Sequence, residues 1–283
     1  MSRVIVMNIA LAGHEGLVGH FLKERLEKEG HKFVLLIDKR SGTSLADLTK
    51  MTPLGKIDIF IHAAAHCKIN QGIANPELDH INNATGIFEV LEFCRKNKIP
   101  KILFFSSSRV LSKEKNPYTA SKIYGEELCK SYQQCYGIDY IIIRPSTVYG
   151  PFWDLTRRLA HIYITNAFEG KDLEVYGNPK TKTLDFTYID DFVSATLLAI
   201  NGPWNTEYDI SGEEEYNIYK LAEFIIRNTS SKSKIKVLDA EIAQPQTVRL
   251  DNSKIKRLGY KPEYSVEQGM LKTIDWYKNY LKK

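Results

Sequence analysis

The chain has 283 residues, of which 43% are hydrophobic and 26% are charged. These are ordinary globular values, so long disorder and a coiled coil are excluded as the main architecture, and the length predicts one large domain or two small ones. The net charge of +5 is scattered along the sequence, which suits a phosphate-bearing substrate and gives little support for nucleic-acid binding.

No apolar run approaches the roughly 20 residues that a bilayer requires, so we expect no membrane span. The N-terminus enters a strand-like run without a cleavage-site pattern, so we expect no signal peptide and a cytoplasmic protein. The four cysteines show neither a CxxC pair nor the Cys/His spacing of zinc sites. We therefore predict free thiols and no metal at Cys67, Cys94, Cys129 and Cys135.

Short apolar runs alternate with helical periodicity in the first half of the chain. Such alternation predicts repeated βαβ units and a parallel sheet. The runs Phe33–Ile37 and Ile102–Phe105 are continuously apolar, as in strands that are covered on both faces. We expect strands at Val4–Ala10, Lys32–Asp38, Ile57–His62, Lys101–Ser107 and Tyr140–Arg144, and helices at Leu17–Glu29, Asn83–Asn97 and Tyr118–Tyr136.

After Gly150-Pro151 the pattern becomes less regular, with shorter elements and more turn signals. We expect a core domain over residues 1–150 and a smaller, irregular lobe over 151–283 that binds a second ligand, with some segments returning to the core. The expected elements are helices at Ile189–Ile200, Tyr219–Asn228 and Val266–Leu281 and an exposed, Lys-rich connector at Thr229–Lys236.

A glycine-rich turn follows the first predicted strand and opens the first helix. A tight turn here needs residues without Cβ, and the helix N-terminus offers free N–H groups to a pyrophosphate. The turn runs Gly13-His14-Glu15-Gly16-Leu17-Val18-Gly19, and Asp38 ends the second strand. Its carboxylate can accept hydrogen bonds from the adenosine ribose and would repel a 2′-phosphate, which favours NAD over NADP. Lys39 and Arg40 leave NADP open as the less favoured cofactor, because a base beside Asp38 could hold that phosphate.

The candidate catalytic residues stand at a strand end and a helix start. Tyr118 and Lys122 are four residues apart, so a helix places them on one face. A free tyrosine has a pKa near 10, and a nearby ammonium would favour its phenolate form. Ser106-Ser107-Ser108 end the fourth strand, where ligands of open α/β sheets bind. The three residue types together predict acid–base chemistry on a substrate hydroxyl.

Taken together, these motifs resemble the extended short-chain dehydrogenase/reductase family, specifically its nucleotide-sugar epimerases and dehydratases of the UDP-glucose 4-epimerase type. The resemblance runs nearly end to end. It includes the glycine turn, His62-Ala63-Ala64-Ala65, Asn83-Ala84-Thr85-Gly86, Ser106–Leu111, the Tyr118/Lys122 pair, Arg144–Pro151, Asp185–Asp191, Arg249-Leu250-Asp251 and Leu258–Pro262.

The resemblance implies a Rossmann-type doubly wound parallel sheet with a smaller α/β substrate lobe, a bound NAD and a nucleotide-diphosphate sugar as substrate. Ser107, Tyr118 and Lys122 fall on the family's catalytic positions. The implied cofactor contacts are Gly13, Gly16, Leu17, Val18, Gly19, Asp38, Lys39, Ala63, Ala64, Ala65, Asn83, Tyr118, Lys122 and Pro145, and the implied substrate contacts are Ser107, Ser108, Thr147, Val175, Tyr176 and Arg249. Relatives often form homodimers through the helices that we expect at Asn83–Asn97 and Tyr118–Tyr136, where Ile123, Leu128 and Tyr132 are core or interface residues.

Several positions depart from the family pattern on the substrate side. Thr147 replaces an asparagine that usually contacts the diphosphate, and Leu184 replaces an arginine. Arg249 is then the best remaining candidate for the diphosphate, with a surface ion pair as its alternative. Dehydratases carry an acidic pair at the positions of Ser108 and Arg109, so dehydration by that pair is disfavoured.

Two reactions remain open, because one Ser/Tyr/Lys set serves both. The first is epimerisation by transient oxidation at the sugar C4 with Tyr118 as base. The second is reduction of a nucleotide 4-ketosugar by NAD(P)H. Asp38 favours the NAD-recycling epimerase. A non-catalytic NAD(P)-sensing module is disfavoured by the intact catalytic set, and nucleic-acid binding would rest only on the Lys-rich Thr229–Lys236 segment.

Overall fold

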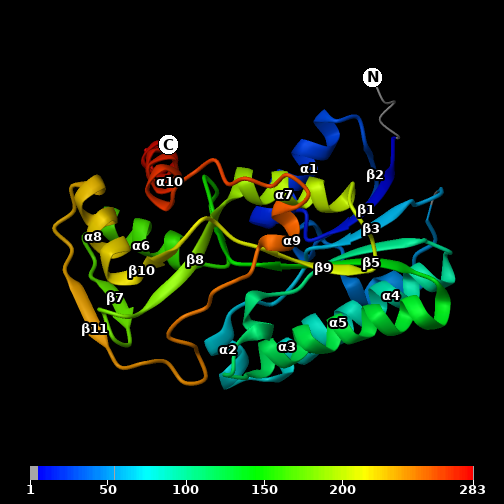
Figure 1. The fold of residues 1–283 in the computed structure, drawn as a ribbon, viewed down its shortest axis with the longest axis horizontal. Helices are drawn as coiled ribbons and strands as arrows, with labels where there is room; N and C mark the ends of the chain where they lie inside the picture. Colours follow the sequence, from blue (N-terminus) through cyan, green and yellow to red (C-terminus); the bar gives the residue numbers. More distant parts are fainter. Residues whose placement is uncertain (1–5, 54, 283) are drawn as a thin grey trace.

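The computed structural model describes residues 6–53 and 55–282. Its main sheet is parallel and has six strands, and Figure 1 shows it on the right. The strand order is β2-β1-β3-β4-β5-β9, so the chain reverses direction across the sheet between β1 and β3. The strands are β1 (Asn8–Ala12), β2 (Lys32–Ile37), β3 (Ile59–His62), β4 (Lys101–Phe105), β5 (Asp139–Pro145) and β9 (Thr206–Ile210).

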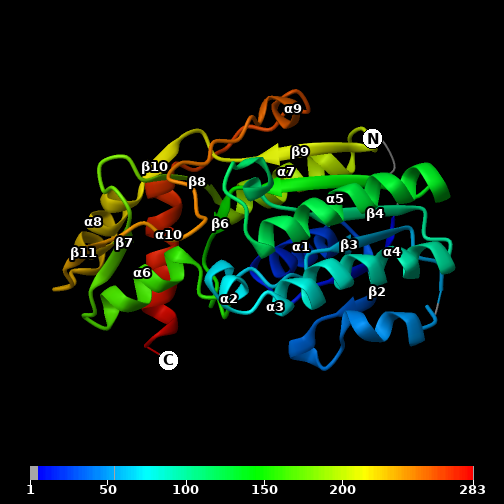
Figure 2. The same cartoon turned by 90° about the horizontal axis from the view of Figure 1, so that it is seen from below.

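Helices cover both faces of this sheet (Figure 2), which explains why its strands read as continuous apolar runs. Successive strand residues point to opposite faces, and β1 shows this directly. Ile9 and Leu11 belong to the core shared with α1 and α7, whereas Ala10 and Ala12 belong to the core shared with α4 and α5. The helices are α1 (Leu17–Lys28), α7 (Ile189–Ile200), α4 (Gly86–Lys96) and α5 (Pro117–Tyr136).

The rest of the second half forms a separate, smaller lobe at the end of the main sheet (Figures 1 and 2). It holds a three-stranded sheet of order β10-β8-β6 and a two-stranded sheet of β11 and β7. Its elements are β6 (Thr147–Tyr149), β7 (Leu173–Tyr176), β8 (Thr183–Tyr188), β10 (Glu215–Asn217), β11 (Ile235–Leu238), α6 (Leu159–Phe168), α8 (Ile218–Thr229) and α10 (Val266–Tyr280).

Short helical turns complete the structure. Most of them lie in the connections that leave the carboxyl ends of the main strands, where they shape the candidate site. They are η1 (Lys39–Ser41), η2 (Leu45–Lys50), α2 (Ile69–Ala74), α3 (Glu77–Asp79), the π-helical turn η3 (His80–Thr85), η4 (Ser108–Leu111) and α9 (Ser253–Lys256).

The predicted fold class is confirmed, and the differences are local. The first strand is Asn8–Ala12 rather than Val4–Ala10, and residues 4 and 5 lie outside the described residues. Asn83 begins no α-helix, because it belongs to the π-helical turn that precedes α4. Thr229–Lys236 is only partly a connector, because β11 begins at Ile235 and the Ser231 hydroxyl donates to the carbonyl of Ala167 at 2.6 Å. The edge strand β9 was not predicted.

Three further features bear on the site. Within residues 6–53 and 55–282, no helix is both long and apolar enough to cross a bilayer. The same residues contain no cluster of His, Cys, Asp and Glu that could hold a metal ion. All four cysteines lie in this part of the chain, and each is a free thiol, as predicted.

Candidate active site

Two adjoining cavities lie outside the carboxyl ends of the main strands. The first, of about 440 Å³, is lined by Gly13, Gly16 and Gly19 and is called the glycine-turn cavity here. The second, of about 640 Å³, extends toward the small lobe and is called the arginine-lined cavity, after Arg109, Arg157 and Arg158. The residues that line both are Val18, Cys67, Lys68, Tyr118, Pro145, Thr156 and Arg158. Two ligands bound side by side would therefore meet at Tyr118.

The glycine turn brings backbone close to backbone in the first cavity. A Cβ on Gly13 would lie 2.6 Å from the amide nitrogen of Ala64, and Gly13 has a φ of +90°. A Cβ on Gly19 would lie 2.1 Å from the Gly13 carbonyl oxygen. Helix α1 starts at Leu17, and its N-cap residue, Gly16, has no side chain to satisfy the first N–H groups. These donors line the cavity and fit a pyrophosphate.

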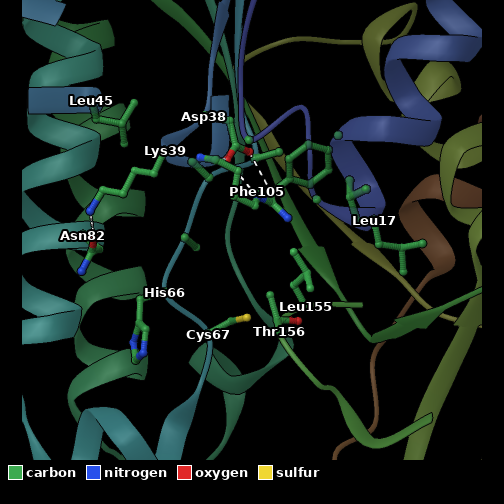
Figure 3. Close-up of a pocket in the computed structure, with 18 of the residues that line it drawn as sticks. Leu17, Asp38, Lys39, Leu45, His66, Cys67, Asn82, Phe105, Leu155 and Thr156 are labelled. Carbon is green, nitrogen blue, oxygen red and sulfur yellow. Dashed lines mark hydrogen bonds and ion pairs between the residues drawn. The ribbon is translucent and has the colours of Figure 1, made fainter. Parts of the chain in front are cut away.

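Asp38 directly follows β2 at the rim of the same cavity, and its carboxylate already has hydrogen-bond partners within the chain. Its carboxylate accepts from Arg40 Nε and Nη2, each at 2.9 Å, and from the Glu15 amide at 3.2 Å. Burial would raise the pKa of Asp38, but the Arg40 hydrogen bonds outweigh it and hold this pKa below its usual value. Lys39 points away from this pair toward Asn82, as Figure 3 shows. A carboxylate and a guanidinium thus both stand where an adenosine ribose would bind.

Local sequence fixes the position of Tyr118 at the start of α5. The Asn116 side chain accepts from the Thr119 amide at 3.0 Å, and Pro117 occupies the first helical position. Both features favour a helix that begins at this point, which sets Tyr118 in its first turn. Lys122 follows one turn later, and its ammonium lies 6.0 Å from the centre of the Tyr118 ring. Both side chains line the glycine-turn cavity.

Burial dominates the electrostatics of these groups. It raises the pKa of Tyr118 to about 12, although the nearby Ser107 hydroxyl and the Arg109 charge oppose the rise. It lowers the pKa of Lys122 to about 8, against the opposing effect of the Cys67 and Glu126 charges. The Lys122 ammonium donates to the Phe105 carbonyl at 2.8 Å. A bound substrate hydroxyl would meet a neutral phenol, with a serine hydroxyl and an ammonium beside it.

A buried hydrogen-bond network fixes the wall of the cavity after β3. Asn83 accepts from the His66 amide at 2.8 Å and donates to the His66 carbonyl at 2.9 Å. It also donates to Ser121 Oγ at 3.1 Å, which ties this wall to α5. The Asp79 carboxylate fixes the His66 ring, because its Oδ1 lies 2.8 Å from His66 Nδ1. Asn83 itself lines neither cavity, so it acts on a ligand only through the backbone of His66.

Known families and structures match this arrangement. The family model of the NAD dependent epimerase/dehydratase family matches residues 9–218. The chain belongs to this family. The predicted resemblance is confirmed, and the chain is a sugar-nucleotide enzyme of the epimerase type or a related oxidoreductase.

Two relatives described as epimerases are similar to most of this chain. A protein of Methanocaldococcus jannaschii described as a putative UDP-glucose 4-epimerase is 26% identical, over 96% of this chain and 98% of its own length. The UDP-glucuronate 4-epimerase of Thermodesulfobacterium geofontis is 28% identical, over 78% of this chain and 73% of its own length. The crystal structure of the Bacillus cereus UDP-glucuronic acid 4-epimerase with UDP-glucuronic acid and NAD has a TM-score of 0.87 at 25% identity. The match covers 97% of this chain and 100% of that one.

Most of the predicted site residues of this epimerase-family chain line one of the two cavities, and a few line neither. All predicted cofactor residues except Asn83 line the glycine-turn cavity, and Ser107, Ser108, Thr147 and Tyr176 line the arginine-lined cavity. Val175 does not, because alternate residues of β7 face opposite ways and Val175 packs into the core. Arg249 is exposed and lines neither cavity. Its expected diphosphate contact has no support in this geometry.

Several site residues were missing from the sequence analysis. They come from the connections after β3 and β6 and from the small lobe, which no local motif marks as functional. His66, Cys67 and Thr156 line the glycine-turn cavity, and in Figure 3 the Cys67 thiol points toward Thr156. The missed cations are Lys68, Arg157, Arg158 and Lys182. A basic residue pair after Gly150-Pro151, Arg157-Arg158, was the one available signal.

Proposed function

We propose that the chain is an NAD-dependent nucleotide-sugar 4-epimerase that oxidises the sugar transiently at C4, with Tyr118 as the base. The observation that carries this proposal is the position of Tyr118 on the wall common to the glycine-turn and arginine-lined cavities. A dinucleotide in the first cavity and a sugar in the second would present their reacting ends to one phenol oxygen.

The chain's own residues supply positioning and proton transfer. The Tyr118 oxygen takes the proton from the sugar hydroxyl and later returns it. The Ser107 hydroxyl, on the same side of the cavity, donates to the sugar oxygen as its carbonyl character develops. A cationic Lys122, 6.0 Å from the centre of the Tyr118 ring, would favour the phenolate, against the burial that raises the pKa of this phenol to about 12. The residues of the glycine-turn cavity would hold NAD, which would supply a reversible hydride acceptor for the sugar C4.

The proposed cofactor is NAD rather than NADP. The family is NAD-dependent, and Asp38 at the rim of the glycine-turn cavity supports a ribose with two free hydroxyls. The Asp38–Arg40 pair is the one observation that supports NADP, because an Arg40 released from Asp38 could hold a 2′-phosphate. We nevertheless propose NAD, because the 2′-phosphate of NADP would have to approach the buried Asp38 carboxylate, which repels it.

An epimerase is favoured over a 4-ketosugar reductase. Several curated relatives are named as UDP-sugar epimerases, and none of those described above is named as a reductase.

We also propose that residues 1–150 mainly hold the cofactor and residues 151–283 mainly the sugar nucleotide, with α7 and β9 returning to the main sheet.

The direct test is product analysis. Purified chain is incubated with UDP-, dTDP-, GDP- and CDP-sugars, with added NAD, NADP or NADPH, and the products are identified by NMR. We expect interconversion of C4 epimers without net consumption of a cofactor, and support by NAD better than by NADP. Stoichiometric use of NADPH on a 4-ketosugar, without epimerisation, would contradict the proposal.

We further propose a homodimer that packs through η3, α4 and α5. Three large apolar side chains are exposed there, namely Ile81, Phe88 and Tyr124, and a groove of about 580 Å³ is lined by residues of η3, α4 and α5. Helical faces of this kind commonly mark interfaces. Sedimentation velocity should give about twice the mass of one chain, and Phe88→Glu with Tyr124→Glu should give monomers. A monomeric wild-type protein at micromolar concentration would overturn this proposal.

A further inference from the structure

Arg109 differs from the neighbouring cations of the arginine-lined cavity because its charge has no partner among the described residues. Its Nη1 is buried and has no hydrogen-bond partner among the described residues, and its guanidinium forms no ion pair with them. A buried donor without a partner is costly, more so when it carries charge. By contrast, Arg158 is paired with Asp154 at 2.7 Å, and the Lys182 ammonium donates to the Pro245 carbonyl at 2.6 Å.

Within residues 6–53 and 55–282, no carboxylate is placed to neutralise Arg109 by contact. Glu241 and Glu114 act on it electrostatically, but neither forms an ion pair with it. Each has another partner, since Glu241 accepts from Asn70 at 2.6 Å and Glu114 accepts from the Ser112 hydroxyl. Arg109 therefore lines the cavity as a cation without an ion-pair partner among the described residues.

Arg109 stands at the reacting end of this cavity. It lies two residues after Ser107, in the turn η4 that leaves β4, and it lines the cavity together with Ser107, Ser108 and Tyr118. Its charge acts on the Tyr118 phenol. In a nucleotide sugar the diphosphate is attached at C1, across the ring from C4. C3 and C5 both adjoin C4, and of the two it is C5 that carries the exocyclic carbon, which is a carboxylate in a hexuronate.

The charges of the whole cavity point the same way. Two carboxylates, Glu174 and Glu241, stand against five cationic side chains, namely Lys68, Arg109, Arg157, Arg158 and Lys182. A nucleotide diphosphate brings two negative charges, and a sugar carboxylate would add a third. The forked donors of an arginine suit a carboxylate because they can form two parallel hydrogen bonds with it.

We propose that Arg109 is a specificity residue that binds the C5 carboxylate of a nucleoside-diphosphate hexuronate. This inference rests on the proposed function, because it takes Tyr118 as the group that meets the sugar C4. The substrate class is then an acidic nucleotide sugar, with a neutral hexose as the disfavoured alternative.

Binding to the NAD-loaded protein tests the proposal without requiring turnover. Calorimetry with UDP-glucuronate and UDP-glucose should give an affinity at least ~10-fold higher for the uronate, the range expected for a charge-assisted hydrogen-bonded pair. Arg109→Gln should remove most of this ratio by weakening the uronate. Arg109→Lys should keep part of it. Arg257→Gln, at an exposed position outside both cavities, is the matched control and should leave the ratio unchanged.

Failure of this inference can be distinguished from failure of the proposed function. Equal wild-type affinities for the two sugars would overturn the role of Arg109 and leave epimerisation of UDP-glucose possible. An equal loss for both sugars in Arg109→Gln would also overturn it, since it would indicate a diphosphate contact. An Arg109-dependent preference for UDP-glucuronate without conversion by the wild type would support the site and refute the epimerase. If Arg109→Gln does not fold, the affinity ratio of the two sugars in the wild type and in Arg109→Lys still tests the role of Arg109.

Discussion

Tyr118→Phe should lower kcat about 10³-fold and leave NAD affinity within about twofold of wild type. The change removes one oxygen atom at the wall between the two cavities and keeps the ring that packs there. Proton transfer at the sugar oxygen then lacks its base, because the Ser107 hydroxyl accepts from the Arg109 amide at 3.2 Å and is too weakly basic to replace the phenolate, and Lys122 donates to the Phe105 carbonyl. Turnover by product NMR and NAD affinity by calorimetry measure the two quantities.

A matched control is available on the same helix. Tyr136→Phe changes an exposed tyrosine at the far end of α5 and should leave both quantities unchanged. A Tyr118→Phe protein that keeps more than about a tenth of wild-type turnover would remove Tyr118 as the base, since general acid–base catalysis contributes at least about 10²-fold. Loss of NAD affinity in that variant would instead assign the phenol mainly to cofactor binding.

Gly19→Ala should abolish measurable NAD binding and lower the free energy of unfolding by about 1–3 kcal/mol, as overpacked sites do. The added Cβ would lie 2.1 Å from the Gly13 carbonyl oxygen and 2.9 Å from the His14 Cα, so the turn itself has to move. Both contacts are backbone atoms, which cannot swing aside as a flexible side chain could. The shifted turn no longer presents its N–H groups to a pyrophosphate.

Gly55→Ala is the comparison for this variant, because nothing described lies within 4 Å of a Cβ at that position. It should bind NAD normally and unfold at the wild-type denaturant concentration. The account of the glycine turn would be wrong if Gly19→Ala bound NAD as tightly as Gly55→Ala did.

The sequence predicted the part of the site that short-range rules determine. A strand, a tight turn and a helix follow one another directly at Gly13–Gly19, and the strand end at Ser107 lies only eleven positions before Tyr118. Position in the chain and position in space are closely tied in such motifs. Asp38 was found for the same reason, because it directly follows β2.

The remaining features depend on packing between distant segments. Strand β9 has the sequence Thr-Glu-Tyr-Asp-Ile, which lacks a continuous apolar run because it pairs at a sheet edge. In the sequence, Arg40 is indistinguishable from a solvated loop charge, whereas in the structure its guanidinium donates to Asp38. Val175 and Arg249 were expected at the substrate, but the side-chain alternation of β7 buries the first, and the second is exposed outside both cavities. Arg109 could be read as a departure from the family, but only the cavity shows that its charge lacks a partner.

Isotope transfer tests the central claim most directly. A UDP-sugar that the chain converts is prepared with deuterium at C4 and incubated with the NAD-loaded protein in ordinary water. If Tyr118 moves only the proton on the C4 oxygen, the deuterium must remain at C4 in both epimers at equilibrium. Replacement of that deuterium by solvent hydrogen would show proton abstraction from carbon and would contradict the proposed chemistry.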